Sequence, residues 1–193
     1  MASLTFPRTL PAWSVSLLAI VAVAAAVIDI RSRKVPNWLT LPAMALAVAA
    51  HGLTGGMGLD GERLGLVGSL TGLAVGLVPL AVCWLAFGAP GGGDVKLMGA
   101  LGALGGWEFA VRAMFLGFAA GAVMALIVMI RRRVVRQTLK RMWLTLLMVL
   151  GGQAKSAEAV VGGDSPTIPF AAALSVGAIA AAAEAIIRVN LAG

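Results

Sequence analysis

Charged side chains are scarce in this chain. Asp, Glu, Lys and Arg together make up 12% of the 193 residues, whereas 60% are apolar and the mean hydropathy is +0.98. Soluble globular domains carry about 25% charged residues, so this composition excludes the ordinary soluble class. The sequence predicts an all-α polytopic membrane protein, folded as a single transmembrane domain over residues 1–193.

Cysteine and histidine are almost absent as well. Because Cys83 is the single cysteine, the chain can form neither an internal disulfide nor a thiolate metal cage. The one histidine, His51, has no carboxylate or cysteine at metal-ligand spacing, and we expect it at the external end of a helix. No metal or other cofactor is therefore expected.

Long apolar runs dominate what is present. A helix needs about 20 apolar residues to cross a bilayer. The six runs cover residues 11–30, 38–53, 64–87, 95–107, 109–130 and 168–189. The sequence thus predicts about six transmembrane helices, of which the second and fourth are short.

Residues 131–163 differ from the apolar runs, because basic residues alternate there with Val, Leu, Met and Trp. The pattern favours an amphipathic helix in the cytoplasmic interface over a seventh short insertion at residues 142–150. The basic residues of this segment that carry the pattern are Arg131, Arg132, Arg133, Arg136, Lys140 and Arg141.

The distribution of Lys and Arg sets the expected orientation, since basic loops are retained in the cytoplasm. When the runs are threaded alternately, 11 of the 15 basic residues fall on one side and 4 on the other. We therefore expect both termini outside, and Asp29 and Asp94 on the cytoplasmic face. The net charge of +7 is explained by this topology signal, so no nucleic-acid partner is expected; the lipid bilayer is the expected surrounding.

Asp29 lies at the end of the first apolar run, just before Arg31, Arg33 and Lys34. The basic residues are explained as a stop-transfer signal. The stop-transfer signal does not explain Asp29, because an acidic residue does not help to retain a loop in the cytoplasm and is unfavourable near a helix C-terminus. The structural alternative is an ion pair with Arg33, four residues later.

Asp94 follows three glycines, Gly91, Gly92 and Gly93. The structural alternative for Asp94 is the N-cap of the fourth helix. Three consecutive glycines exceed what a cap requires, however, and glycine is favoured where a backbone must approach another chain closely. Gly91 to Gly93 are therefore candidates for admitting the backbone of an extended peptide.

Two carboxylates on one membrane face have a specific chemical use. Like charges a few ångströms apart cannot both ionise without cost, so the pair holds one shared proton. Such a pair can activate a water molecule and protonate a leaving amine, as peptide hydrolysis requires. We therefore interpret Asp29 and Asp94 as candidate catalytic residues.

Three stretches together resemble a known family: Gly-Gly-Gly-Asp-Val-Lys-Leu at residues 91–97, Asp29 with its basic residues before Pro-Asn at 36–37, and Ile-Pro-Phe at 168–170. They resemble the type IV prepilin peptidases, the aspartic leader peptidases of pilus and type II secretion systems. The resemblance implies that Asp29 and Asp94 are the catalytic aspartates. It also implies cleavage of a membrane-inserted pilin precursor at the cytoplasmic face of the bacterial inner membrane, with the pilus assembly machinery as a further partner.

One feature of the family is missing. Bifunctional members resemble this chain in their second part, but they also carry a pair of CxxC motifs associated with N-methylation of the new pilin N-terminus. With Cys83 alone, the chain resembles the short, peptidase-only form of tight-adherence (Flp-type) pilus systems. Archaeal preflagellin peptidases are a related short form.

Further polar residues have both structural and functional interpretations. Lys96 either contacts an acidic residue of the substrate or extends along the helix to the interface, and Asn37 either caps the second helix or orients a carboxylate. Glu184 is expected to pair with Arg188, four residues later.

Small residues of the fourth and fifth apolar runs permit close helix approach, either for a docked pilin helix or for internal packing alone. They are Gly99, Gly102, Gly105, Gly117 and Gly121.

Two other classes of function compete with the peptidase. An ion-coupled transporter also uses acidic groups in broken helices, but no inverted repeat is visible and most runs lack an acidic residue in the middle. A non-enzymatic assembly subunit would tolerate the loss of either aspartate. Glu158 and Asp164 could compete for the catalytic role, but their surroundings indicate an exposed loop.

Overall fold

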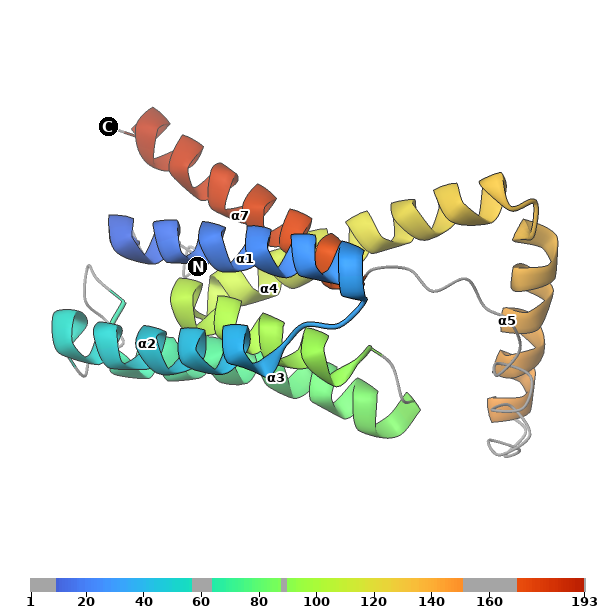
Figure 1. Ribbon diagram of the computed structural model, residues 1–193, viewed down its shortest axis with the longest axis horizontal. Helices are drawn as coiled ribbons and strands as arrows, with labels where there is room; N and C mark the ends of the chain where they lie inside the picture. The colour runs from blue at the N-terminus through green and yellow to red at the C-terminus, as the bar shows by residue number, and fades with distance from the viewer. Residues whose placement is uncertain (1–9, 57–63, 88–89, 151–169, 193) are drawn as a thin grey trace, which may run out of the picture. The chain divides into compact units, whose positions relative to one another are not determined.

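The described residues of the computed structural model, which are 10–56, 64–87, 90–150 and 170–192, contain helices and no strand. The helices are α1 (Ala12–Ser32), α2 (Asn37–Gly55), α3 (Leu66–Phe87), α4 (Gly92–Arg131), α5 (Val135–Leu150) and α7 (Phe170–Ala192) (Figure 1). By length and composition, α1 to α4 can each cross a membrane, and α7 contains a shorter apolar stretch, Phe170–Glu184. The chain is a polytopic helical membrane protein; the number of crossings stays a prediction.

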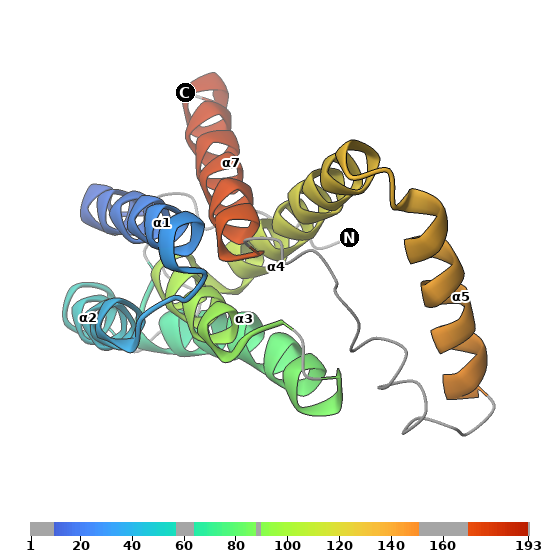
Figure 2. The ribbon, with the colours of Figure 1, turned by 45° about the vertical axis from the view of Figure 1, so that its right-hand side comes forward.

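The chain divides into two compact units. One consists of Met1–Ala120 with Pro169–Gly193, and the other of Gly121–Ile168. In the first unit, α1 packs against both α2 and α7, and α2 packs against α3 (Figures 1 and 2). Both candidate aspartates belong to this unit.

Helix α4 is broken at Gly106, whose backbone is non-helical with φ 81° and ψ 177°. A Cβ built on Gly102 would lie 3.3 Å from the Cβ of Ala110. Residues eight apart in a straight helix are separated by about 12 Å, so the chain folds back at the break. The boundary expected between the fourth and fifth apolar runs is therefore a tight reversal at Gly106, which joins the two helical segments of α4.

The break leaves backbone carbonyl groups without partners in the helix, and side chains from three other helices lie within hydrogen-bond distance of them. Ser69 Oγ donates to the carbonyl oxygen of Ala103 at 2.8 Å. Ser14 Oγ lies 2.6 Å from the carbonyl oxygen of Leu104, and His51 Nε2 lies 3.2 Å from the same atom. Non-helical backbone at membrane depth is tolerated only where it is buried in protein and satisfied in this way.

His51 lies near the end of α2, as expected, but its ring is fully buried. Besides Leu104, it contacts the carbonyl oxygen of Leu64 through Nδ1 at 3.1 Å, and the ring of Trp13 at a centroid distance of 4.7 Å. It therefore joins α2 to α1, to the segment before α3 and to the break in α4.

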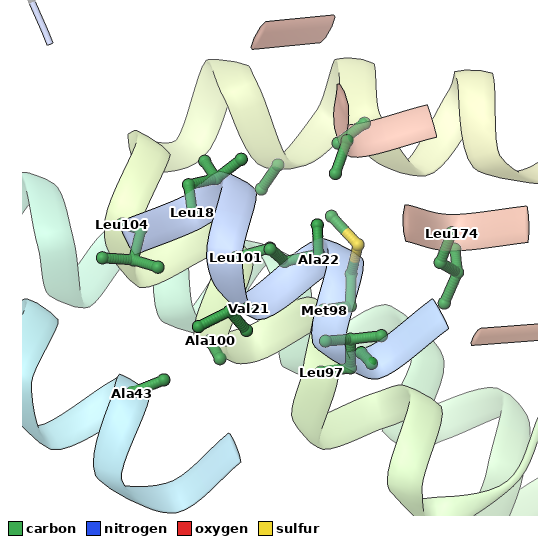
Figure 3. Close-up of a cluster of buried hydrophobic side chains, with 14 of the residues drawn as sticks. Leu18, Val21, Ala22, Ala43, Leu97, Met98, Ala100, Leu101, Leu104 and Leu174 are labelled. Atoms are coloured by element: carbon green, nitrogen blue, oxygen red, sulfur yellow. The ribbon is translucent and has the colours of Figure 1, made fainter. Parts of the chain in front are cut away.

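The core of the first unit lies among α1, α2, α3, α4 and α7. Figure 3 shows Leu18, Val21 and Ala22 of α1 facing Leu97, Met98 and Leu101 of α4, with Ala43 and Leu174 at the sides. Small residues bring the backbones close together: a Cβ on Gly72 of α3 would collide with the carbonyl oxygen of Gly102. Burial of these side chains fixes the helices against one another.

The glycines expected to receive a docked pilin helix mostly pack against other residues of the chain. Gly99 packs against Met44 and Leu77, and Gly117 packs against Leu174 of α7. Added Cβ atoms at Gly102 and Gly105 would meet Gly72 and Phe109, respectively. For these four glycines the docking interpretation is wrong, and the internal-packing alternative is correct.

The variant Ser14→Ala tests whether side-chain hydrogen bonds stabilise the break in α4. We expect Ser14→Ala to lower the free energy of unfolding by about 1 kcal/mol, because the buried Leu104 carbonyl loses the hydrogen bond that Ser14 donates. Ser16→Ala is the matched control, since exposed Ser16 bonds only the Ala12 carbonyl of its own helix. Thermal unfolding in detergent measures both; equal melting temperatures for the two variants would contradict the interpretation.

Candidate active site

Asp29 lies in the last turn of α1, where its carbonyl oxygen accepts the N–H of Arg33 at 2.8 Å. Its carboxylate is buried, with 5% of the residue exposed, and Oδ2 accepts the N–H of Ala172 at 3.1 Å. Ala172 is in the first turn of α7, where an N–H group has no partner within the helix. In the described part of the chain this N–H, and not the side chain of Arg33, is the partner of the carboxylate.

Asp94 lies in the first turn of α4, as its third residue, and is not the N-cap. Its Oδ2 accepts the N–H of Gly91 at 3.1 Å. A carboxylate at the third helical position commonly reaches back to the N–H just before the helix. Asp94 thus makes a capping hydrogen bond, as expected, but it makes this bond from the third helical position and not from the N-cap.

The two carboxylates, 65 positions apart in sequence (94 − 29), lie at the same end of the bundle. Each carboxylate also accepts an N–H at the beginning of a helix, α7 for Asp29 and α4 for Asp94. Because a helix N-terminus carries partial positive charge, both helices offset the repulsion between the aspartates.

Two contacts hold the segments that carry these aspartates against each other. A Cβ built on Gly93 would lie 3.1 Å from both the Cβ and the carbonyl oxygen of Val35. Lys96 Nζ donates a hydrogen bond to Asn37 Oδ1 at 2.9 Å. Asn37 therefore neither caps α2 nor bonds a carboxylate here; it binds Lys96 and ties the start of α2 to α4.

The three glycines before Asp94 differ in their surroundings. Gly93 is tightly packed against Val35, whereas a Cβ on Gly92 would make an ordinary contact of 3.7 Å with Trp84. Gly91 is exposed, and a Cβ there would meet only Asp94, at 3.4 Å. Gly91 is thus the most open of the three, whereas Gly92 and Gly93 are both half-buried and Gly93 has the closer neighbours.

Comparison with known proteins bears directly on this arrangement. The sequence model of the type IV leader peptidase family matches residues 16–126, more than half of the chain and including both aspartates. The chain belongs to this family. No curated protein and no solved structure matches it. Membership identifies the chain as a peptidase, of a family that works by aspartic chemistry, rather than as a transporter or an assembly subunit.

Sequence reasoning did not find the Ala172 N–H, although the Pro-Phe start of the last helix was a usable signal for a helix N-terminus near the site. Glu184 lies 3.8 Å from Arg112 of α4. The side chain of Arg188, its expected partner, lies outside the described residues, as do Glu158 and Asp164.

The Lys96–Asn37 hydrogen bond predicts a local change in stability. We expect Lys96→Met to speed amide hydrogen exchange over residues 33–40 about fivefold, because loss of about 1 kcal/mol makes local opening more frequent. Lys96→Arg, which keeps a cationic donor, is the matched control and should exchange like the wild type. Mass spectrometry of the exchanged peptides measures this, and unchanged exchange in Lys96→Met would show that the bond does not hold the two segments together.

Proposed function

We propose that this leader peptidase is a membrane aspartic endopeptidase in which Asp29 and Asp94 carry out the chemistry. The observation that carries the proposal is the placement of both carboxylates at one end of the bundle, each accepting an N–H at the start of a helix. Family membership supports it, because the matched region contains both residues.

In the proposed reaction one carboxyl group is protonated and the other is ionised. The ionised carboxylate takes a proton from a water molecule, whose oxygen forms a bond to the carbonyl carbon of the scissile peptide. The protonated carboxyl group gives its proton to the amide nitrogen as the C–N bond breaks. The products are a leader with a new carboxyl group and a mature protein with a new amine.

We propose a membrane-inserted prepilin-like precursor as the substrate, cleaved at the cytoplasmic face. The concentration of basic residues beside the Asp29 and Asp94 ends of their helices supports this orientation, with the termini outside and the inner membrane as the location. The substrate backbone would approach Asp94 along Gly91 and Gly92, of which Gly91 is exposed and Gly92 half-buried.

Lys96 is also compatible with a substrate contact. An ammonium group has three N–H donors, and Asn37 occupies one of them. The absence of the two CxxC motifs supports peptidase activity without N-methylation, because Cys83 is the single cysteine.

The direct test is cleavage of a co-reconstituted pilin precursor by Asp29→Asn and Asp94→Asn. We expect each variant to lose at least about 100-fold in cleavage rate, since general acid–base catalysis contributes about 10²–10⁴-fold. Asparagine keeps a carbonyl oxygen that can accept the N–H of Ala172 or Gly91, so the fold should be retained. Appearance of the mature N-terminus, followed by mass spectrometry, is the measurement.

Glu108→Gln is the matched control for that test, because it neutralises an acidic residue of α4 next to the Gly106 break and should keep full activity. Folding is checked by thermal unfolding of each variant in detergent. If a well-folded Asp29→Asn or Asp94→Asn variant processes the precursor at the wild-type rate, that residue has no catalytic role.

A further inference from the structure

Helix α5 presents an apolar stripe without a covering partner in the described part of its unit. Leu139, Trp143 and Leu147 recur every four residues, and each has between 49% and 62% of its surface exposed. Residues spaced by four lie on one face of a helix. Arg136 and Lys140, which are also exposed, share a neighbouring face. An exposed apolar row and an exposed basic row thus run side by side along α5.

All charged side chains of residues 131–150 are positive. Arg131, Arg132, Arg133, Arg136, Lys140 and Arg141 give six positive charges, and residues 121–150 contain no Asp or Glu to neutralise them. An ion pair within the segment is therefore impossible. A partner that complements it must be anionic and must also accept a stripe of Leu and Trp.

The start of α5 is held close to the end of α4. Arg133 has a left-handed backbone with φ 57°. The Arg133 N–H bonds the carbonyl oxygen of Ile130 at 3.0 Å, and the Val134 N–H bonds that of Met129 at 3.1 Å. This pair of bonds is the Schellman arrangement that ends a helix in an ordered turn. Because α5 begins at Val135, its first turn lies within about 14 Å of the last residue of α4.

The part of α4 after the Gly106 break, residues 107–131, is by itself long and apolar enough to cross the bilayer, so a helix that begins a few residues after it starts at the level of the lipid headgroups. A basic amphipathic helix at that level binds by burying its apolar face below the headgroups and by attraction to anionic lipid. We propose that residues 131–150 form a binding surface for anionic phospholipid headgroups. In this arrangement α5 lies in the leaflet from which α4 emerges, with Leu139, Trp143 and Leu147 toward the acyl chains.

The test uses the full chain reconstituted into vesicles of phosphatidylcholine with or without phosphatidylglycerol. In a Cys83→Ser background, Leu139→Cys reports burial of the stripe through its reaction rate with a water-soluble thiol reagent. Leu85→Cys, on an exposed part of spanning helix α3, is the control and should react equally in both lipids. We expect Leu139→Cys to be protected only when phosphatidylglycerol is present, and protection to weaken at high salt.

Charge variants decide whether headgroups are recognised. Adding Arg136→Gln and Lys140→Gln should raise the Leu139→Cys reaction rate in phosphatidylglycerol vesicles by about 25-fold, at about fivefold per basic residue near an anionic surface. Arg136→Lys with Lys140→Arg keeps the charge and should keep the protection. Equal protection in both lipids would show apolar insertion without headgroup binding, and equal reactivity in both would assign the surface to another partner; either result overturns the proposal.

Discussion

The arrangement depends on holding two carboxyl groups together at the edge of an apolar bundle. When both are ionised, repulsion between Asp29 and Asp94 acts against the folded state unless other groups offset it. The structure places each carboxylate against an N–H at the start of a helix, Ala172 for Asp29 and Gly91 for Asp94. The loop after α1, the start of α4 and the start of α7 must therefore converge, and the Lys96 hydrogen bond to Asn37 joins α2 to the same point.

A second constraint acts at the Gly106 reversal of α4, where backbone carbonyl groups are released inside an apolar protein. Water cannot satisfy them there, and an unsatisfied buried carbonyl costs about 1–3 kcal/mol. Ser14 of α1 and Ser69 of α3 donate hydrogen bonds to two of these carbonyl groups, and a ring nitrogen of His51 in α2 lies 3.2 Å from one of them. Polar residues of apolar helices thus have two separate uses in this chain: at the break they stabilise a backbone reversal, and at the aspartates they position reactive groups.

The sequence predicted the helical membrane fold from a local signal, the length of the apolar runs, and it singled out Asp29 and Asp94 by the basic residues after one and the glycines before the other. The catalytic role of the two aspartates stays a prediction. The sequence could not predict which side chains meet. In a membrane protein the lipid-facing and protein-facing sides of a helix are both apolar, so periodicity does not reveal the packed face. The Ala172 contact, the burial of His51 and the internal packing of Gly117 all depend on helix pairing and were therefore missed or left open.

The central claim is that Asp29 and Asp94 act as one catalytic unit. The most direct measurement is single-turnover cleavage of a pilin precursor by the double variant Asp29→Asn/Asp94→Asn beside the two single variants. Residues that act as a unit are strongly non-additive, so the double variant should be no slower than the slower single variant. If the losses of the two single variants instead multiply in the double variant, the aspartates contribute independently and the paired mechanism is wrong.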